Sequence, residues 1–271
     1  MVDSFSLDLP TGATLYVERL GVGAPVVLIH GNFASLRMWD SQLPLADSFD
    51  LIRYDIRGFG WSPLGTGRYS DEGDLAALLD ALGIDSAHLV GASYGGAVAI
   101  DFALRYPSRA RSIVTVPGGI GGWDAPAWMF TGWDEFEAAV DAGDYARATA
   151  AIMAFPPMRP LEARPALHRQ VATMIENHRW AEYGGPVEVD VLDPPAARRL
   201  GEIDVPTLVL SGQLDDDAFL ALGDRMAHEM ANADRLIIEG GSHWVNMELP
   251  DEFNTAAAQF IRPQAQRTAR A

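Results

Sequence analysis

Six short apolar segments, each bounded by Gly, Pro or Asp, recur along the chain and restrict its fold more than any other feature. They span residues 26–30, 51–55, 88–93, 112–116, 207–212 and 235–240. Runs of this kind are typical of strands that are buried on both faces of a parallel sheet. Helix-like stretches lie between most of them, at 71–82, 94–106 and 218–230, and another follows at 250–261. This alternation predicts an α/β fold, an open sheet with helices on both faces.

Two further segments extend this pattern. Residues 5–9 and 14–20 alternate between apolar and polar around a Pro-Thr-Gly turn, which predicts an antiparallel hairpin at the edge of the sheet. About ninety residues separate the fourth apolar run from the fifth, too many for a simple crossover. We therefore expect an α/β core domain of residues 1–117 and 204–271, with residues 118–203 inserted as a helical cap (lid) domain.

The charge and composition exclude several classes of function. The 271 residues include 37 acidic and 20 basic side chains, for a net charge of −17, which disfavours nucleic acids and anionic membranes as partners. All the basic residues are Arg, so Schiff-base lysines and phosphate-loop lysines are excluded. The absence of Cys excludes thiol catalysis, disulfides and thiolate metal sites. No secretory pattern or membrane-length apolar run is present, and we expect a cytoplasmic protein.

A G-x-S-x-G motif at residues 91–95 follows one predicted strand and opens a predicted helix. This is the context that a nucleophile elbow requires. The positions two before and two after the serine must be nearly free of side chain, as Gly91 and Gly95 are. Ser93 is therefore the candidate nucleophile, at the carboxyl edge of the sheet and the N-terminus of a helix.

A serine nucleophile needs a base at the end of another strand. His243 stands just past the last apolar run and is the candidate. His30 ends a strand and is expected to pack beneath the site. His88 is expected at the start of a strand. The other three histidines are expected at helix positions facing solvent, and they are His168, His178 and His228.

The base in turn needs a carboxylate that fixes its tautomer and stabilises the imidazolium. Asp215 follows the strand at 207–212 and is the candidate. Its neighbours Asp216 and Asp217 remain alternatives, as does Asp124, which follows the strand before the expected cap.

Acyl transfer also needs two N–H donors for the oxyanion of the tetrahedral intermediate. The backbone N–H of Tyr94, the residue after the nucleophile, is one candidate. The second is expected from residues 30–33, from Asn32 or alternatively Phe33, where Gly31 lets the backbone turn towards the site. This chemistry requires no metal and no cofactor.

The motifs resemble the α/β-hydrolase family in order and along nearly the whole chain. They are HGNF at 30–33, DIRGFGWS at 55–62, GASYGG at 91–96, SGQLD at 211–215 and GGSHWVNMELP at 240–250. The resemblance implies a mostly parallel twisted sheet of about eight strands, a cap after the sixth strand, and the triad Ser93, Asp215 and His243. It also implies that Asp55 and Arg57 are structural rather than catalytic.

This chain differs from the motifs of several α/β-hydrolase subfamilies, and these differences limit the reactions that the resemblance implies. Haloalkane dehalogenases and epoxide hydrolases of this fold have Asp where this chain has Ser93. The meta-cleavage carbon–carbon hydrolases typically carry HGxGPG, whereas this chain has Phe33 and Ala34. The remaining resemblance is to enol-lactonases and carboxylesterases, which implies a serine hydrolase of an ester or lactone. Carbon–carbon hydrolysis, thioester hydrolysis, a biosynthetic tailoring reaction and a non-catalytic small-molecule receptor remain alternatives.

The expected cap is rich in aromatic residues, including Trp123, Trp128, Trp133 and Trp180. Such residues favour a small-molecule substrate with an apolar portion, although they equally serve to pack a lid onto its base. We expect substrate contacts from Phe33 and Trp244, which adjoin site residues, and from Trp123 and Trp128. The sequence indicates no oligomeric state.

Overall fold

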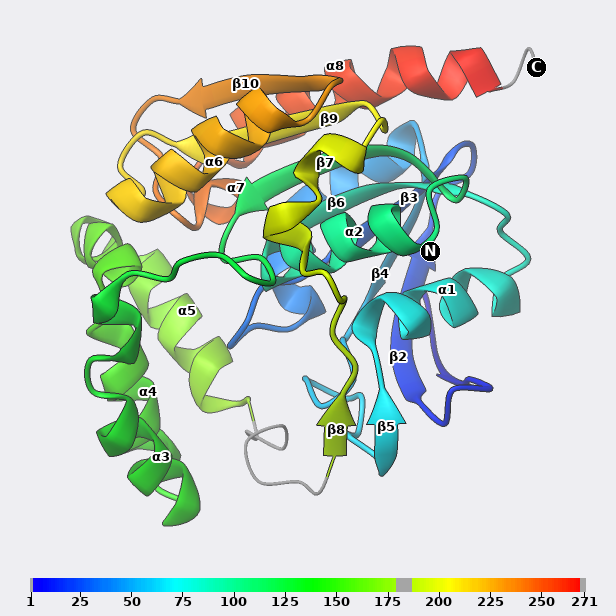
Figure 1. Cartoon of the computed structure of the whole chain (residues 1–271). Coiled ribbons are helices and arrows are strands. Elements are labelled where there is room, and N and C mark those ends of the chain that lie inside the picture. Colours follow the sequence, from blue (N-terminus) through cyan, green and yellow to red (C-terminus); the bar gives the residue numbers. More distant parts are fainter. Residues whose placement is uncertain (1, 179–186, 269–271) are drawn as a thin grey trace.

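The computed structural model describes residues 2–178 and 187–268, and within them eight strands form one main sheet (Figure 1). The strand order is β1-β2-β4-β3-β6-β7-β9-β10. Their bounds are β1 (Asp3–Asp8), β2 (Thr14–Leu20), β3 (Pro25–Ile29), β4 (Asp50–Tyr54), β6 (Ala87–Ser93), β7 (Ala110–Pro117), β9 (Thr207–Gly212) and β10 (Ala233–Ile238). β1 and β2 form the edge hairpin, β2 is antiparallel to β4, and the other neighbours are parallel. The predicted α/β fold and mostly parallel sheet are confirmed.

Helices cover both faces of this sheet because alternate strand residues point to opposite sides. Val27 and Leu89 pack in the layer of α1 (Asp71–Ala81), α2 (Tyr94–Arg105) and α6 (Asp217–Glu229). Val26 and Val90 pack in the other layer, with the 3-10 helix η1 (Leu36–Asp47) and α8 (Pro250–Thr268). The four helices expected from the sequence correspond to α1, α2, α6 and α8, whereas η1 was not anticipated.

The long connection between β7 and β9 contains α3 (Trp133–Asp141), α4 (Tyr145–Met153) and α5 (Pro165–Glu176), with the 3-10 segments η2 (Ala127–Phe130) and η3 (Pro156–Ala163). In Figure 1 the three α-helices (green) lie together at one side of the molecule, away from α1 and α8. Phe136, Ile152 and Val171 are buried among them. Trp180 lies outside the described residues. That residues 118–203 form a separate cap domain stays a prediction.

The last part of this connection packs against the core rather than with α3–α5. Ala196, Ala197 and Leu200 join the cluster beneath α2 and α6. Before them, β8 (Val187–Val189) pairs in parallel with β5 (Gly67–Tyr69) in a second sheet that the sequence analysis did not anticipate. Three-residue strands are too short to show a periodic pattern, which explains why they were missed.

The DIRGFGWS segment after β4 is held by two buried acidic residues. The Asp55 carboxylate accepts hydrogen bonds from the backbone N–H groups of Leu36 (2.7 Å) and Trp61 (2.9 Å), and burial raises its pKa to about 6. Arg57 donates two hydrogen bonds, of 2.7 and 2.8 Å, to Asp74 in the first turn of α1. Asp55 and Arg57 thus fasten η1 and α1 to the end of β4.

We expect Asp74→Ala to destabilise the protein strongly, because the change leaves the Arg57 charge buried without its carboxylate. Both side chains of this pair are at most 3% exposed. Removing one partner of a buried ion pair costs about 3–5 kcal/mol. The midpoint of urea-induced unfolding measures the effect. Glu202→Ala, which removes the exposed partner of Arg199, is the matched control and should leave the midpoint nearly unchanged; equal shifts in both variants would contradict the assignment.

Candidate active site

Ser93 occupies a strained turn between β6 and α2. Its backbone has φ 53° and ψ −116°, a conformation that residues other than Gly rarely adopt. A Cβ at Gly91 would lie 2.3 Å from the carbonyl oxygen of Gly95, and one at Gly95 would lie 2.1 Å from that of Ile29. Both motif glycines are therefore required by the close approach of β3, β6 and α2.

A third glycine, Gly118, packs against the Ser93 turn from the neighbouring strand end, and the sequence analysis missed it. It follows β7, and a Cβ there would lie 2.4 Å from both Cα and Oγ of Ser93. The signal was available, because a Gly-Gly pair follows the apolar run next in the chain after that of Ser93. Bare backbone at the end of β7 thus leaves room for the Ser93 side chain.

His243 is hydrogen-bonded to Asp215 through Nδ1, which lies 3.0 and 3.1 Å from the two carboxylate oxygens. The acceptor is a carboxylate, so Nδ1 carries the proton and the lone pair of neutral His243 is on Nε2. The structure thus brings Asp215 to His243, whereas Asp216 caps α6 through Ala218 N–H, and Asp217 and Asp124 are exposed.

The pKa of His243 lies above its ordinary value of 6.5. Burial lowers this pKa, but the negative charge of Asp215 and its hydrogen bond raise it, with help from Asp216 and Glu248. The acidic residues around the ring therefore favour the imidazolium form of His243.

Two other histidines, His30 and His178, are buried and held by contacts with neighbouring residues. Ile56 N–H donates to Nε2 of His30 (3.0 Å), so Nδ1 is the protonated nitrogen and donates to the Gly31 carbonyl (2.8 Å). Burial lowers the pKa of His30 to about 3. The prediction that His178 faces solvent is wrong: it is 2% exposed and stacks on Phe59 at 4.6 Å. It lies beyond the end of α5, where helical periodicity no longer decides which way a side chain points.

The loop after β3 lies beside the Ser93 turn, because a Cβ at Gly31 would be 3.4 Å from the Cβ of Ser93. Phe33 has φ 60°, and its N–H donates to the side-chain oxygen of Asn32 (3.1 Å). The Gly31 N–H donates to the sulfur of Met38 (3.2 Å). On the other side, Tyr94 begins α2 and its hydroxyl donates to Asp71. Both segments expected to supply oxyanion donors are thus fixed by local hydrogen bonds.

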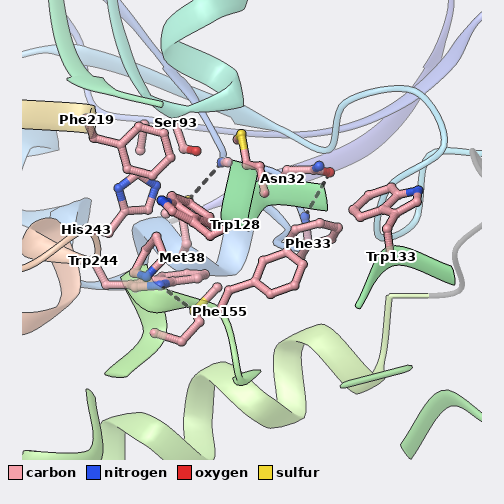
Figure 2. A pocket seen from close by; sticks show the side chains of 15 residues that line it. Asn32, Phe33, Met38, Ser93, Trp128, Trp133, Phe155, Phe219, His243 and Trp244 are labelled. Carbon is pink, nitrogen blue, oxygen red and sulfur yellow. Dashed lines mark hydrogen bonds between the residues drawn. The ribbon is translucent and has the colours of Figure 1, made fainter. Parts of the chain in front are cut away.

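A cavity of about 390 Å³ contains both Ser93 and His243 in its wall (Figure 2). Its lining consists of Gly31, Asn32, Phe33, Met38, Ala92, Ser93, Trp128, Met129, Trp133, Phe155, Pro157, Met158, Phe219, His243 and Trp244. Phe33, Trp128 and Trp244 were expected there. Met38 and Phe219 were not, because each lies on an element whose inward face the sequence does not reveal.

Trp123 was expected to contact substrate, but the lining does not include it. Its ring instead stacks on Phe219, with the centroids 5.6 Å apart, and packs on the core cluster of α2 and α6. Trp123 therefore supports the wall of the cavity from behind rather than forming it.

The chemistry of the lining is neutral and mostly apolar. Its polar side chains other than Trp are Asn32, Ser93 and His243, and none of the described lining residues is an Arg. A buried carboxylate is stable only when a cation or several donors pair with it. The cavity is therefore suited to a neutral, apolar ligand.

Hydrogen bonds made by Asn246, Gln42 and Arg164 fix the loop that carries His243. Asn246 donates to the Met38 carbonyl (3.0 Å) and its own carbonyl accepts from Gln42 (2.9 Å), which joins α7 (Val245–Glu248) to η1. Arg164, just before α5, donates to the carbonyls of Gly240 and Glu248, both at 2.8 Å. The β10–α7 loop is thus held from the core and from the α3–α5 segment.

A serine on a strained strand-to-helix turn, with an Asp-bound His at the same edge of a parallel sheet, defines the class of hydrolases built on α/β sheets. The family model for the alpha/beta hydrolase fold matches residues 24–250, and the chain belongs to this family. The predicted family is confirmed, and the protein is an α/β-hydrolase enzyme with a small-molecule substrate.

Relatives of this chain are named as several kinds of hydrolase. It is 30% identical to a 2-hydroxy-6-oxononadienedioate/2-hydroxy-6-oxononatrienedioate hydrolase of Burkholderia vietnamiensis, over 88% of this chain and 86% of that one. A thermophilic esterase from Thermogutta terrifontis has a TM-score of 0.80 at 25% identity, over 97% and 99% of the two chains. The enol-lactonase of Burkholderia xenovorans LB400 shares the fold with a TM-score of 0.75 at 23% identity, over 95% and 99%.

Neither a membrane helix nor a metal site is found in the described part of the chain. Among residues 2–178 and 187–268, no helix is both long enough and apolar enough to cross a bilayer. Over the same residues, no three His, Cys, Asp or Glu side chains are grouped as a metal site would require.

We expect the His243 imidazole to titrate above pH 6.5 in nitrogen-15 NMR of the histidine-labelled protein. In Asp215→Asn its pKa should fall, because the charge that raises it is lost while the burial that lowers it remains. Asp217→Asn is the control, since this exposed residue starts α6 and is not among the groups that shift the pKa of His243. A His243 midpoint unaffected by Asp215→Asn would contradict the electrostatic account.

Proposed function

We propose that this protein is a serine hydrolase that cleaves a carboxylic ester or lactone with an apolar portion. The observation that carries the proposal is the shared cavity, in which a strained Ser93 and an Asp215-bound His243 meet a neutral apolar wall. The reaction is acyl transfer, with Ser93 as nucleophile, His243 as general base and acid, and Asp215 as the orienting carboxylate.

In this mechanism Nε2 of His243 removes the Ser93 hydroxyl proton as Oγ attacks the substrate carbonyl. The backbone N–H groups of Asn32 and Tyr94 bind the oxyanion. Phe33 is the less suitable second donor, because its own N–H is already directed to the Asn32 side chain. His243 then protonates the leaving alcohol, and a water molecule activated by His243 releases the acid from the acyl-enzyme.

Carbon–carbon hydrolysis is the second candidate, favoured by the similarity to the dienedioate hydrolase. The substrate in that relative's name carries two carboxylates, which a closed site must pair with positive charge. The described lining of this cavity offers none apart from protonated His243. Neutral esters and lactones therefore fit the site better than dienoates do.

We expect Ser93→Ala to reduce hydrolysis of p-nitrophenyl butyrate by at least about 10⁴-fold, because the acyl-enzyme cannot form. The parent protein should be labelled stoichiometrically by a fluorophosphonate and the variant not at all, with circular dichroism reporting an intact fold. Ser41→Ala, on the exposed side of η1, is the control and should retain full turnover. Turnover retained in Ser93→Ala would refute the mechanism, and labelling of the parent without turnover would favour a receptor.

We expect the enzyme to prefer p-nitrophenyl butyrate over mono-p-nitrophenyl succinate by about 100-fold in kcat/KM, because burial of an unpaired carboxylate costs several kcal/mol. The corresponding neutral succinamide ester is the size control and should react nearly as fast as the butyrate. A preference for the carboxylate, or faster cleavage of a 2-hydroxy-6-oxodienoate than of any ester, would support carbon–carbon hydrolysis instead.

A further inference from the structure

Phe219 lies against the imidazole of His243. The ring centroids are 4.6 Å apart and the planes are 23° from parallel, so the two rings are stacked (Figure 2). Phe219 is 3% exposed and stands near the start of α6, four residues after Asp215. One short stretch of chain therefore supplies both the carboxylate at the edge of the imidazole and the aromatic ring on its face.

Two tryptophans hold Phe219 in this position. Trp123 stacks on it at 5.6 Å, and Trp128 meets it edge-on at 5.8 Å with an interplanar angle of 87°. The indole N–H of Trp128 donates to the Asp216 carboxylate (3.2 Å), which also caps α6. The Phe219 ring is thus enclosed by aromatic side chains and has little room to move away from His243.

The hydrogen bonds to Asp215 fix only one edge of the imidazole. They hold Nδ1, but they leave the ring free to pivot about that edge, and a small pivot moves Nε2 away from the nucleophile. A ring stacked on the face opposes this motion through dispersion contacts over its whole area. Phe219 therefore supplies the orientation that Asp215 alone does not.

Stacking also has an electrostatic effect once His243 is protonated. The face of a phenyl ring carries partial negative charge and attracts a cation whose centre lies within about 6 Å of its centroid, most strongly where water is excluded. The imidazole stacks on Phe219 well inside this range, in a buried site. The contact strengthens when His243 accepts the Ser93 proton.

We infer that Phe219 is a positioning residue that holds the plane of the His243 imidazole and stabilises its protonated form, an inference that rests on the proposed hydrolase function. The acidic groups that also act on this ring are Asp215 and Asp216 at the start of α6 and Glu248 in α7. None of them is altered when Phe219 is replaced, and lost burial would raise the pKa of His243, so a fall in this pKa reports the loss of the aromatic face.

The test compares Phe219→Leu with Phe253→Leu. The second variant removes another buried phenyl ring, which lies in α8 and packs on Trp39 of η1. We expect Phe219→Leu to lower kcat/KM for p-nitrophenyl butyrate about tenfold, largely in kcat, and to move the acid limb of the pH profile to lower pH. The NMR titration of His243 should move in the same direction. Phe253→Leu should leave both the pH profile and the titration unchanged.

Pentafluorophenylalanine at position 219 separates charge from shape, because it keeps the ring and removes the negative face. It should lower the midpoint of the His243 titration as Phe219→Leu does, although it preserves the packing of the ring. If neither replacement shifts the midpoint relative to Phe253→Leu, the inference is overturned. The NMR measurement needs no substrate, so a failure of ester hydrolysis in the parent would refute the proposed function while leaving this inference tested separately.

Discussion

The close packing of bare backbone around Ser93 is the constraint on which the rest of this site depends. A Cβ at Gly91 would overlap an atom of α2, one at Gly95 an atom of β3, and one at Gly118 an atom of Ser93. The strained φ of 53° at Ser93 persists only because these contacts leave no alternative path for the chain. The packing of β3, β6 and α2, together with Gly118 after β7, thus holds Ser93 in this strained conformation.

The other site residues are brought to this point by the parallel sheet. β3, β6, β9 and β10 all end at one edge, so Asn32, Ser93, Asp215 and His243 follow adjacent or nearby strand ends although 211 positions separate the first from the last. Loops carry no regular ladder of hydrogen bonds, and here side chains replace it. The side chains of His30, Gln42, Asp55 and Asn246 bind backbone groups of neighbouring segments and hold these segments in place.

Much of this arrangement was predictable because it rests on local patterns. The six apolar runs identify the parallel strands, and the G-x-S-x-G turn identifies the Ser93 conformation from steric requirements alone. The features that could not be predicted from the sequence depend on which way a side chain faces in the folded molecule. Phe219 looks like any apolar position of an amphipathic helix, yet it faces His243, and Trp123 stands behind the cavity wall instead of in it. His178 lies past a helix end, and it is buried and stacked on Phe59, a contact that the sequence does not indicate.

The neutral lining of the cavity and the acidic residues beside His243 both suit the proposed reaction, in which charges separate but the total charge stays the same. In the proposed reaction, attack on a neutral ester creates an oxyanion and an imidazolium at the same time, so charge moves within the cavity but its total, set by Asp215, does not change. Low polarity strengthens the attraction of Asp215 for the imidazolium, and of the N–H donors for the oxyanion. A carboxylate on the substrate would add a charge that the described wall has no cation to offset, apart from the imidazolium already paired with Asp215. In the proposed reaction, the low polarity that favours a neutral acyl group is therefore also what disfavours a charged one.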